Sequence, residues 1–340
     1  MSTILAIESS CDETACAIVR NGNEILSNIV SSQINVHTLY GGVVPEVASR
    51  IHVENISAVV TEALAKSGCT MDEIDAVAYT LGPGLIGSLH VGVMAAKTIA
   101  FAFHKPLVPV HHITGHIFAN AFVTELKFPL MALVVSGGHT ELVWMKNDYD
   151  FEVIGTTADD AIGEAYDKVA RVLGLGYPGG PAIDKLAKEG RANPDYKLPT
   201  PKTDNPYNFS FSGLKTAVLQ LNDRLKRNGK EVVPADLAYC FQETALNSMV
   251  DKTIAAVKEK KPVMTVLAGG VAANSRLREL MRERMKEVPE CELVIPPLKY
   301  CTDNAAMIGA VGAAAYAHEA FGTFEDAADP GLEMPGEQLY

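Results

Sequence analysis

The sequence predicts an α/β protein built from two duplicated domains with a cleft between them, and three observations lead to this prediction. The chain has 340 residues, which is more than one hydrophobic core usually supports. Apolar residues make up 48% of the chain and charged residues 21%, so core material is ample. Two stretches that begin near residues 3 and 129 repeat one order of elements, three strands followed by a helix, which indicates a duplication.

The first stretch starts with the apolar run TILAIE, turns at SSCDET, returns as ACAIVR and continues into a third strand, EILSNIV. Short apolar, β-rich runs bounded by turn residues are typical of strands. The second stretch follows the same plan with LMALVV, the turn SGGHT, the strand ELVWMK and a third strand beyond Asn147 and Asp148. Helical sequence follows each stretch, RIHVENISAVVTEALAKSG and DDAIGEAYDKVARVLGL. Each stretch therefore predicts one domain of a tandem pair.

The two hairpin turns are candidates for holding phosphate. Small and hydroxyl residues leave backbone N–H groups free to contact phosphate oxygens. One such turn alone is more often only a tight turn, but a matched pair across a cleft favours a phosphate clamp. The candidates are Ser9, Ser10, Asp12 and Glu13 in the first turn and Ser136, Gly137, Gly138 and His139 in the second.

Two glycine elbows have the same character. Residues 80–89, TLGPGLIGSL, follow the strand AVAYT and lead into an Ala-rich helix. Residues 267–280, LAGGVAANSRLREL, follow the strand VMTVLA, and Asn274 is a plausible N-cap for the next helix,. A strand, a Gly-Gly turn and a helix N-terminus suit the close approach of a nucleotide. The alternative is that Gly269 and Gly270 only turn the chain and that Asn274 only caps the helix.

Composition narrows the class of protein. Six scattered cysteines without a CxxC pair suggest neither a zinc ribbon nor a disulfide framework,. The N-terminus lacks a basic leader,, and the apolar stretch VGVMAAKTIAFAF, which carries Lys97, falls short of a membrane span,. We therefore expect a cytoplasmic protein without a membrane segment. The expected domains are residues 1–127 and 128–323, whose final helix can pack back on the first domain, followed by a loosely held acidic tail at 324–340.

The net charge of −12 argues against a stand-alone nucleic-acid binder, because phosphate contacts need clustered Lys and Arg. Basic stretches do occur at 258–261, KEKK, and at 276–286, RLRELMRERMK. The second stretch mixes Glu with Arg at helical spacing, which favours a solvated helix with internal ion pairs. Any nucleic-acid partner is therefore expected to need help from another protein.

The segment PVHHITGH at 109–116 raises the possibility of a metal site. His112 and His116 are four residues apart, so on a helix they lie on one face,. Such a pair alone is a poor signal, and the HExxH pattern of zinc proteases is missing. Two imidazoles and one carboxylate would leave open positions on a catalytic metal. The best carboxylate candidate is Asp303 in YCTDNAAMIG, although it is about as plausible as a helix N-cap. His111 and His139 are further imidazoles near these turns.

Taken together, the successive motifs resemble the bacterial TsaD family. They are SSCDET, YGGVVPEVASRIH, GPGLIGSL, VHHITGH, VSGGHTEL, DKVARVLGLGYPGGP, FSFSGLKTA, AGGVAANSRL and CTDNAAMIG, in order from about residue 4 to about residue 310. Members are tRNA N6-adenosine threonylcarbamoyltransferases, formerly called O-sialoglycoprotein endopeptidases. The resemblance implies an actin-like, sugar-kinase-like (ribonuclease H-like) fold with a central nucleotide cleft, in agreement with the duplication.

The resemblance also implies a reaction and a site. The threonylcarbamoyl group would move from threonylcarbamoyl-adenylate to N6 of adenosine 37 in tRNAs that read codons starting with A, forming t6A and releasing AMP. One divalent metal per subunit, Fe²⁺ in preference to Zn²⁺, would be held by His112, His116 and Asp303. Thr114 stands where many members carry Glu, which puts in doubt only a role for that acid. The adenylate or an ATP-like nucleotide would be bound by Val135, Ser136, Gly137, Gly138, His139, Asp167, Gly180, Asp184, Gly269, Gly270 and Asn274.

The family also implies partners: tRNA, TsaB as a related dimer mate, TsaE as an ATPase, and a TsaC-type enzyme that supplies the adenylate. Asp12 and Glu13 are candidates for positioning substrate or for a general base. Lys215, in FSFSGLKTA, is a candidate for contacting tRNA or phosphate. Two alternatives share the fold, a small-molecule kinase and a nucleotide-binding scaffold, but neither needs an imidazole metal site. A protease is not supported by any recognisable constellation.

Overall fold

The computed structural model describes residues 2–200 and 202–334, and these form two compact units. Unit 1 comprises Met1–Leu126, Lys146–Glu152 and Pro296–Tyr340, and unit 2 comprises Lys127–Met145 and Val153–Ile295. The chain therefore leaves unit 1, builds unit 2 and returns to unit 1. The expected domain limits and the cleft between the domains stay predictions.

Each unit contains a five-stranded sheet, and the two sheets share one strand order. Unit 1 has the order β3-β2-β1-β4-β5, and unit 2 has β8-β7-β6-β9-β10. In both, the first strand runs antiparallel to the second and parallel to the fourth. The bounds are β1 Thr3–Glu8, β2 Glu13–Arg20, β3 Glu24–Ser32, β4 Ala76–Gly82, β5 Leu107–His111, β6 Leu130–Val135, β7 Thr140–Asn147, β8 Asp150–Thr156, β9 Met264–Ala268 and β10 Glu292–Val294. The repeat predicted from the sequence is confirmed.

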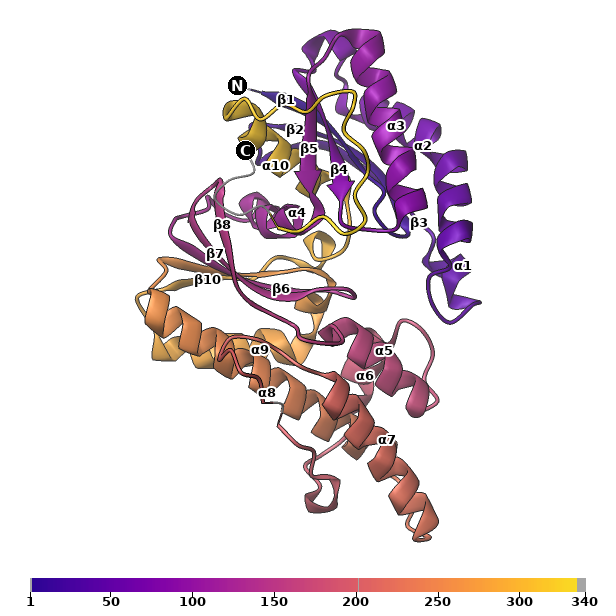
Figure 1. The fold of residues 1–340 in the computed structure, drawn as a ribbon, viewed down its shortest axis with the longest axis vertical. Helices are drawn as coiled ribbons and strands as arrows, with labels where there is room; N and C mark the ends of the chain where they lie inside the picture. Colours follow the sequence, from indigo (N-terminus) through magenta and orange to yellow (C-terminus); the bar gives the residue numbers. More distant parts are fainter. Residues whose placement is uncertain (1, 201, 335–340) are drawn as a thin grey trace. The chain divides into compact units, whose positions relative to one another are not determined.

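Helices cover both faces of the sheet of unit 1. In Figure 1, α2 and α3 lie on one face, and α10 lies on the other beside α4. Every residue of β1 is therefore buried, and the apolar run TILAIE has no polar face. The helices are α1 Ile34–Thr38, α2 Pro45–Ser67, α3 Ile86–Phe103, α4 His112–Phe118 and α10 Ala305–Ala317.

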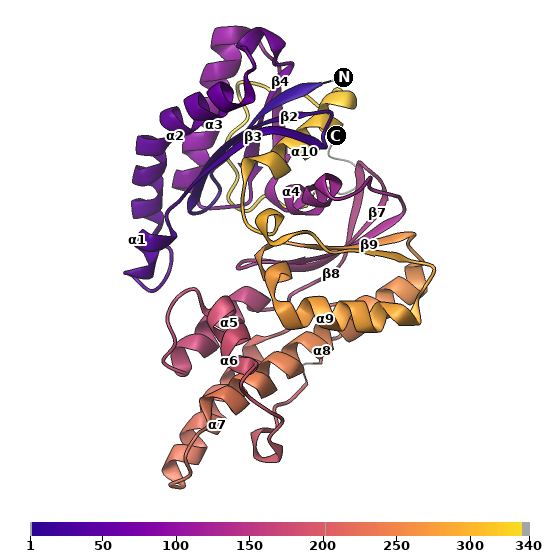
Figure 2. The ribbon, with the colours of Figure 1, turned by 180° about the vertical axis from the view of Figure 1, so that it is seen from behind.

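In unit 2, α8 packs against both α9 and α6, and α5 packs against α6 and α7, as Figures 1 and 2 show from two sides. The bounds are α5 Ile162–Val172, α6 Gly179–Ala187, α7 Ser212–Arg227, α8 Pro234–Lys260 and α9 Ser275–Arg284. Short 3₁₀ turns occupy Met71–Glu73, Ala119–Phe122, Pro194–Tyr196, Gly270–Ala273, Met285–Glu287 and Leu298–Tyr300. The predicted ion pairs on α9 are present, since Arg276 lies 2.6 Å from Glu279 and 3.7 Å from Glu283.

Two sequence expectations differ from the structure. The segment 324–334 is not loosely held: the Asp329 amide donates to the Leu81 carbonyl at 2.9 Å, and the Lys97 ammonium donates to the Phe324 and Asp326 carbonyls at 2.8 and 2.5 Å. Residues 335–340 of the expected tail lie outside the described residues.

In addition, α3 is long and apolar enough to cross a membrane by length and composition. Core helices pass the same test, and α3 packs on β4 and α2.

Candidate active site

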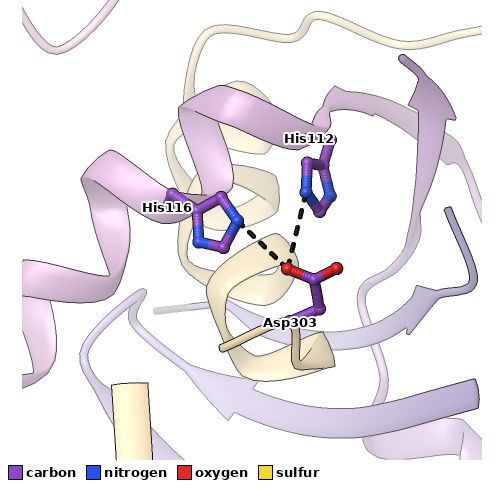
Figure 3. Close-up of side chains that lie close together, drawn as sticks. All are labelled: His112, His116 and Asp303. Carbon is purple, nitrogen blue, oxygen red and sulfur yellow. Dashed lines mark ion pairs between the residues drawn. The ribbon is translucent and has the colours of Figure 1, made fainter. Parts of the chain in front are cut away.

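The structure brings His112, His116 and Asp303 together in unit 1. Figure 3 shows the two imidazoles on α4 pointing at the carboxylate, which comes from the segment before α10. Asp303 Oδ1 lies 3.1 Å from His116 Nε2 and 3.6 Å from His112 Nε2. One ligand atom from each residue lies within 4.8 Å of the others. Both histidines are buried, with exposed fractions of 7% and 1%.

Local structure explains why these three side chains, and not their neighbours, form the cluster. His111 is the N-cap of α4: its Nδ1 accepts from the Ile113 amide at 3.2 Å, and its Nε2 lies 3.0 Å from the Leu332 carbonyl. Asn304 caps α10 by accepting from the Met307 amide at 3.1 Å. Asp303 is therefore not the N-cap, and the alternative left open for it does not hold.

The residues present fit a divalent metal. Nitrogen and oxygen ligands about 2.1 Å from one ion lie roughly 3 to 4 Å from one another, which is close to the spacing of these atoms. His116 is buried; its Nδ1 has no hydrogen-bond partner among the described residues, and its Nε2 lies 3.1 Å from Asp303 Oδ1 without the geometry of a hydrogen bond. Buried polar atoms without partners are rare in proteins. Two neutral imidazoles and a carboxylate suit iron or zinc and leave coordination positions open.

Two carboxylates flank the His112 ring, Glu8 at Nδ1 and Asp303 at Nε2. Burial opposes the charged imidazolium, but the carboxylates of Asp303 and Glu8 outweigh it and raise the pKa of His112 to about 9,. Burial likewise opposes ionisation of Glu8, but the neighbouring His112 lowers the pKa of this carboxyl. Glu8 was not among the residues singled out in the sequence. The only signal for it was an acid at the end of an otherwise apolar strand.

The first hairpin turn lies against this cluster. Ser10 Oγ is 3.2 Å from His112 Nδ1, and Ser9 Oγ donates to the Ser88 carbonyl at 2.8 Å. Both serines are buried, so their hydroxyls are engaged within the chain. The Glu13 carboxyl accepts from Ser32 Oγ at 3.0 Å. Burial, together with the charges of Asp303 and Asp12, raises the pKa of Glu13 to about 9.

The second hairpin turn lies in unit 2 and is closed by its own backbone. The Ser136 amide donates to the His139 carbonyl at 2.8 Å, and the His139 amide donates to Ser136 Oγ at 3.0 Å. A Cβ atom at Gly137 or Gly138 would meet nothing within 4 Å. The two glycines therefore leave open space above the backbone, as a bound phosphate would need.

The other predicted substrate residues also lie in unit 2. Gly269 has φ +88°, and a Cβ there would lie 2.4 Å from the Val135 carbonyl oxygen, so only glycine allows the two segments to approach,. Asp167 accepts from the Gly179 amide at 2.7 Å. No atom lies within 4 Å of a Cβ built at Gly180 or at Gly270.

Asp184 and Asn274 hold the N-terminus of α9. Asp184 accepts from Ser275 Oγ at 2.9 Å, and Asn274 accepts from the Leu277 amide at 2.9 Å, so the predicted N-cap is present. The Asn274 amide also donates to Gln242 at 2.9 Å. Gln242 is a buried support of Asn274 that the sequence did not suggest. Lys215, the candidate phosphate contact, instead pairs with Asp160 at 3.0 Å.

Comparisons with known proteins agree with this geometry. The family model TsaD, described as tRNA N6-adenosine threonylcarbamoyltransferase, matches residues 24–310. Proteins with that same name are 54% identical in Listeria welshimeri, over 97% of this chain and 96% of theirs, and 55% identical in Geobacillus thermodenitrificans, with the same coverage. HypF of T. kodakarensis has a similar structure, with a TM-score of 0.66 and 14% sequence identity, over 96% of this chain and 50% of that one.

The structural likeness shows the fold alone, and it confirms the predicted actin-like α/β fold. The relatives decide the activity, which is that of a transferase, so the kinase and scaffold alternatives are not supported. The family is metal-dependent and acts on tRNA, and the imidazole–carboxylate cluster of unit 1 is a candidate site for the metal. With a family model matched over most of its length and relatives more than half identical to it, the chain belongs to the TsaD family of tRNA N6-adenosine threonylcarbamoyltransferases.

Proposed function

We propose that this enzyme transfers the threonylcarbamoyl group of threonylcarbamoyl-adenylate to N6 of adenosine 37, in tRNAs that read codons beginning with A. The observation that carries the proposal is the buried cluster of His112, His116 and Asp303 in a chain of this transferase family. In the reaction the N6 nitrogen forms a bond to the carbamoyl carbon and loses a proton. The bond from that carbon to the phosphate oxygen breaks, and AMP leaves.

The cluster is proposed to hold one divalent ion, Fe²⁺ in preference to Zn²⁺. When bound, the ion supplies Lewis acidity to an oxygen of the adenylate. The chain's own contribution in unit 1 is to present two imidazoles and one carboxylate from a buried position. Asp12 and Glu13, on the adjoining turn, are proposed to position the substrate or to accept the proton. Ser9 and Ser10 are proposed to hold that turn in place through their buried hydroxyls.

Unit 2 is proposed to bind the nucleotide. The turn Val135, Ser136, Gly137, Gly138 and His139 would receive phosphate oxygens on its open glycine side,. Asp167, Gly180, Asp184, Gly269, Gly270 and Asn274 would surround the nucleoside. Because AMP is a good leaving group, positioning of donor and acceptor should carry much of the rate.

The proposal includes partners and a location. TsaB as a related dimer mate, TsaE as an ATPase and a TsaC-type enzyme as the source of the adenylate would act with this chain in the cytoplasm. The first domain would span residues 1–127 and the second 128–323. Dependence on partners fits the net charge of −12, which disfavours tRNA binding by this chain alone,.

The test compares metal content and transfer in wild type and in His112→Ala/His116→Ala, on unmodified tRNA with the partners present. Near-stoichiometric metal in wild type, lost in the variant together with transfer, is expected. His90→Ala/His104→Ala is the matched control, because it removes two exposed imidazoles from α3 and its C-cap. This control should keep both metal and activity. Retention of metal by the His112/His116 variant would refute the site.

A further inference from the structure

We propose that Glu8 is a positioning residue for the metal site, which holds His112 so that its Nε2 faces the ion. This inference rests on the proposed metal role of His112, His116 and Asp303. Glu8 is the last residue of β1 and is 1% exposed. Its Oε2 lies 3.0 Å from His112 Nδ1, on the side of the ring opposite the nitrogen that faces Asp303.

The Glu8 carboxylate is itself held from two other segments. Thr80 Oγ1, on β4, donates to Oε2 at 2.6 Å, and the Ser10 amide, in the hairpin turn, donates to Oε1 at 2.5 Å. A buried carboxylate is costly unless such donors satisfy it. With both oxygens engaged, the carboxylate has little freedom to rotate. It therefore presents a fixed acceptor to the imidazole of α4.

This contact selects one arrangement of His112. A carboxylate accepts but cannot donate, so the facing Nδ1 carries a hydrogen, and in the neutral imidazole that a metal requires the lone pair is then on Nε2. Outer carboxylates of this kind orient metal-binding histidines and raise their basicity, and their loss costs about 10- to 100-fold in metal affinity. His116 has no equivalent support among the described residues, since its Nδ1 lacks a hydrogen-bond partner. The two imidazoles are thus held unequally, and His112 is the pre-oriented one.

A purely structural role is the competing explanation, because Glu8 joins β1, β4 and α4. The two roles differ in what they predict for the metal. A structural anchor lowers the melting temperature and leaves the metal dissociation constant and the metal's ligand field unchanged. A positioning residue changes the dissociation constant and the ligand field in enzyme that is still folded.

The experiment measures the metal dissociation constant of full-length Glu8→Gln by chelator competition with Fe²⁺ and Zn²⁺, and the visible absorption of the Co²⁺-loaded protein. We expect binding about 10- to 100-fold weaker than in wild type, together with an altered Co²⁺ spectrum. Glu141→Gln, the same substitution at a half-buried carboxyl of β7, is the matched control and should change neither. Glu8→Asp keeps a carboxylate on a shorter chain and should restore part of the affinity. It also provides the test if Glu8→Gln does not fold.

Wild-type metal affinity and a wild-type Co²⁺ spectrum in Glu8→Gln, or in Glu8→Asp if that is the folded variant, would overturn the inference. Failure of the inference is distinguishable from failure of the metal site. If His112→Ala/His116→Ala loses metal while the Glu8 variant binds normally, only the role of Glu8 is rejected. If the histidine variant keeps its metal, the site itself is rejected, and Glu8 has no ligand to orient.

Discussion

Two adjacent residues at the start of α10 have different roles: Asn304 caps the helix, and Asp303 faces the imidazoles of α4. Both residue types favour helix N-caps, so from the sequence either residue could be the N-cap of this helix. In the structure Asn304 accepts from the Met307 amide and also donates to the Thr302 carbonyl at 2.8 Å. The capping role is therefore filled by the asparagine, and the aspartate is available to the imidazoles of α4.

This division predicts opposite effects for two small substitutions. Asp303→Asn should remove most of the bound metal, because the carboxylate charge is lost, while the helix keeps its cap. Asn304→Ala should lower the free energy of unfolding by about 1 kcal/mol and keep the metal. Elemental analysis and urea unfolding of both variants check this. Metal retained by Asp303→Asn, or lost by Asn304→Ala, contradicts the assignment.

Glu141 gives a pH-dependent prediction in unit 2. Burial raises the pKa of this carboxyl to about 7, and its Oε2 has no hydrogen-bond partner among the described residues. The folded state therefore favours the protonated form. The stabilisation is fully present below the unfolded pKa, 4.5, and is lost as the pH rises through 7.

Glu141→Gln should therefore gain stability relative to wild type as the pH rises. The expected relative gain is about 2 kcal/mol between pH 5 and pH 8, from the shift in pKa. Urea unfolding of both proteins at the two pH values measures it. A constant difference between the two proteins would show that Glu141 does not titrate differently in the folded state.

Among the elements, α10 depends most on small residues. A Cβ at Gly309 would lie 2.6 Å from Val19 Cγ2, and one at Gly312 would lie 2.6 Å from Ala78 Cβ. The helix therefore lies against β2 and β4 at a distance that only glycine permits. Because Asp303 precedes this helix directly, the packing of α10 on the sheet also determines where the carboxylate lies.

Gly309→Ala should destabilise the protein by about 1 to 3 kcal/mol, since an added methyl group in a close-packed contact forces backbone or side-chain shifts. Gly213→Ala is the matched control: it lies in α7, and a Cβ there meets nothing within 4 Å. The control should stabilise by up to about 1 kcal/mol. Thermal unfolding of the two variants gives the comparison, and equal effects would refute the packing argument.

At the scale of the whole molecule, a chain with a net charge of −12 has to bind tRNA, which is a polyanion. Two of the four arginines on α9 pair with acids, Arg276 with Glu243 at 2.7 Å and Arg284 with Glu287 at 2.6 Å. The end of α7 differs, because Arg224, Lys226 and Arg227 are exposed and form no ion pair within the described residues. In Figures 1 and 2 this helix extends outward from the body of unit 2. This local charge suits phosphate contacts despite the overall net charge.

Arg224→Gln/Arg227→Gln should weaken tRNA binding and reduce the slope of log affinity against log salt by roughly 2, because each arginine is expected to neutralise one phosphate. Arg282→Gln/Lys286→Gln, on α9 and the turn after it, removes the same charge from a surface interleaved with glutamates and should change the slope less. Filter binding at several salt concentrations, with partners present, supplies the slopes. An unchanged slope in the α7 variant would place the phosphate-binding surface elsewhere.

The sequence alone determined the repeated succession of three strands and a helix, the helical face shared by His112 and His116, the cap at Asn274 and the family. These features depend on patterns within a few residues, or on motifs that relatives share. Tertiary structure decided which of two neighbouring residues caps a helix and which lies in the candidate metal site. His111 caps α4, Asn304 caps α10 so that Asp303 can face the imidazoles, and Glu8 contacts His112. Tertiary structure also placed residues 324–334 against β4 and α3. These outcomes depend on the packing of segments distant in sequence, and local spacing carries no information about which side chains such packing brings together.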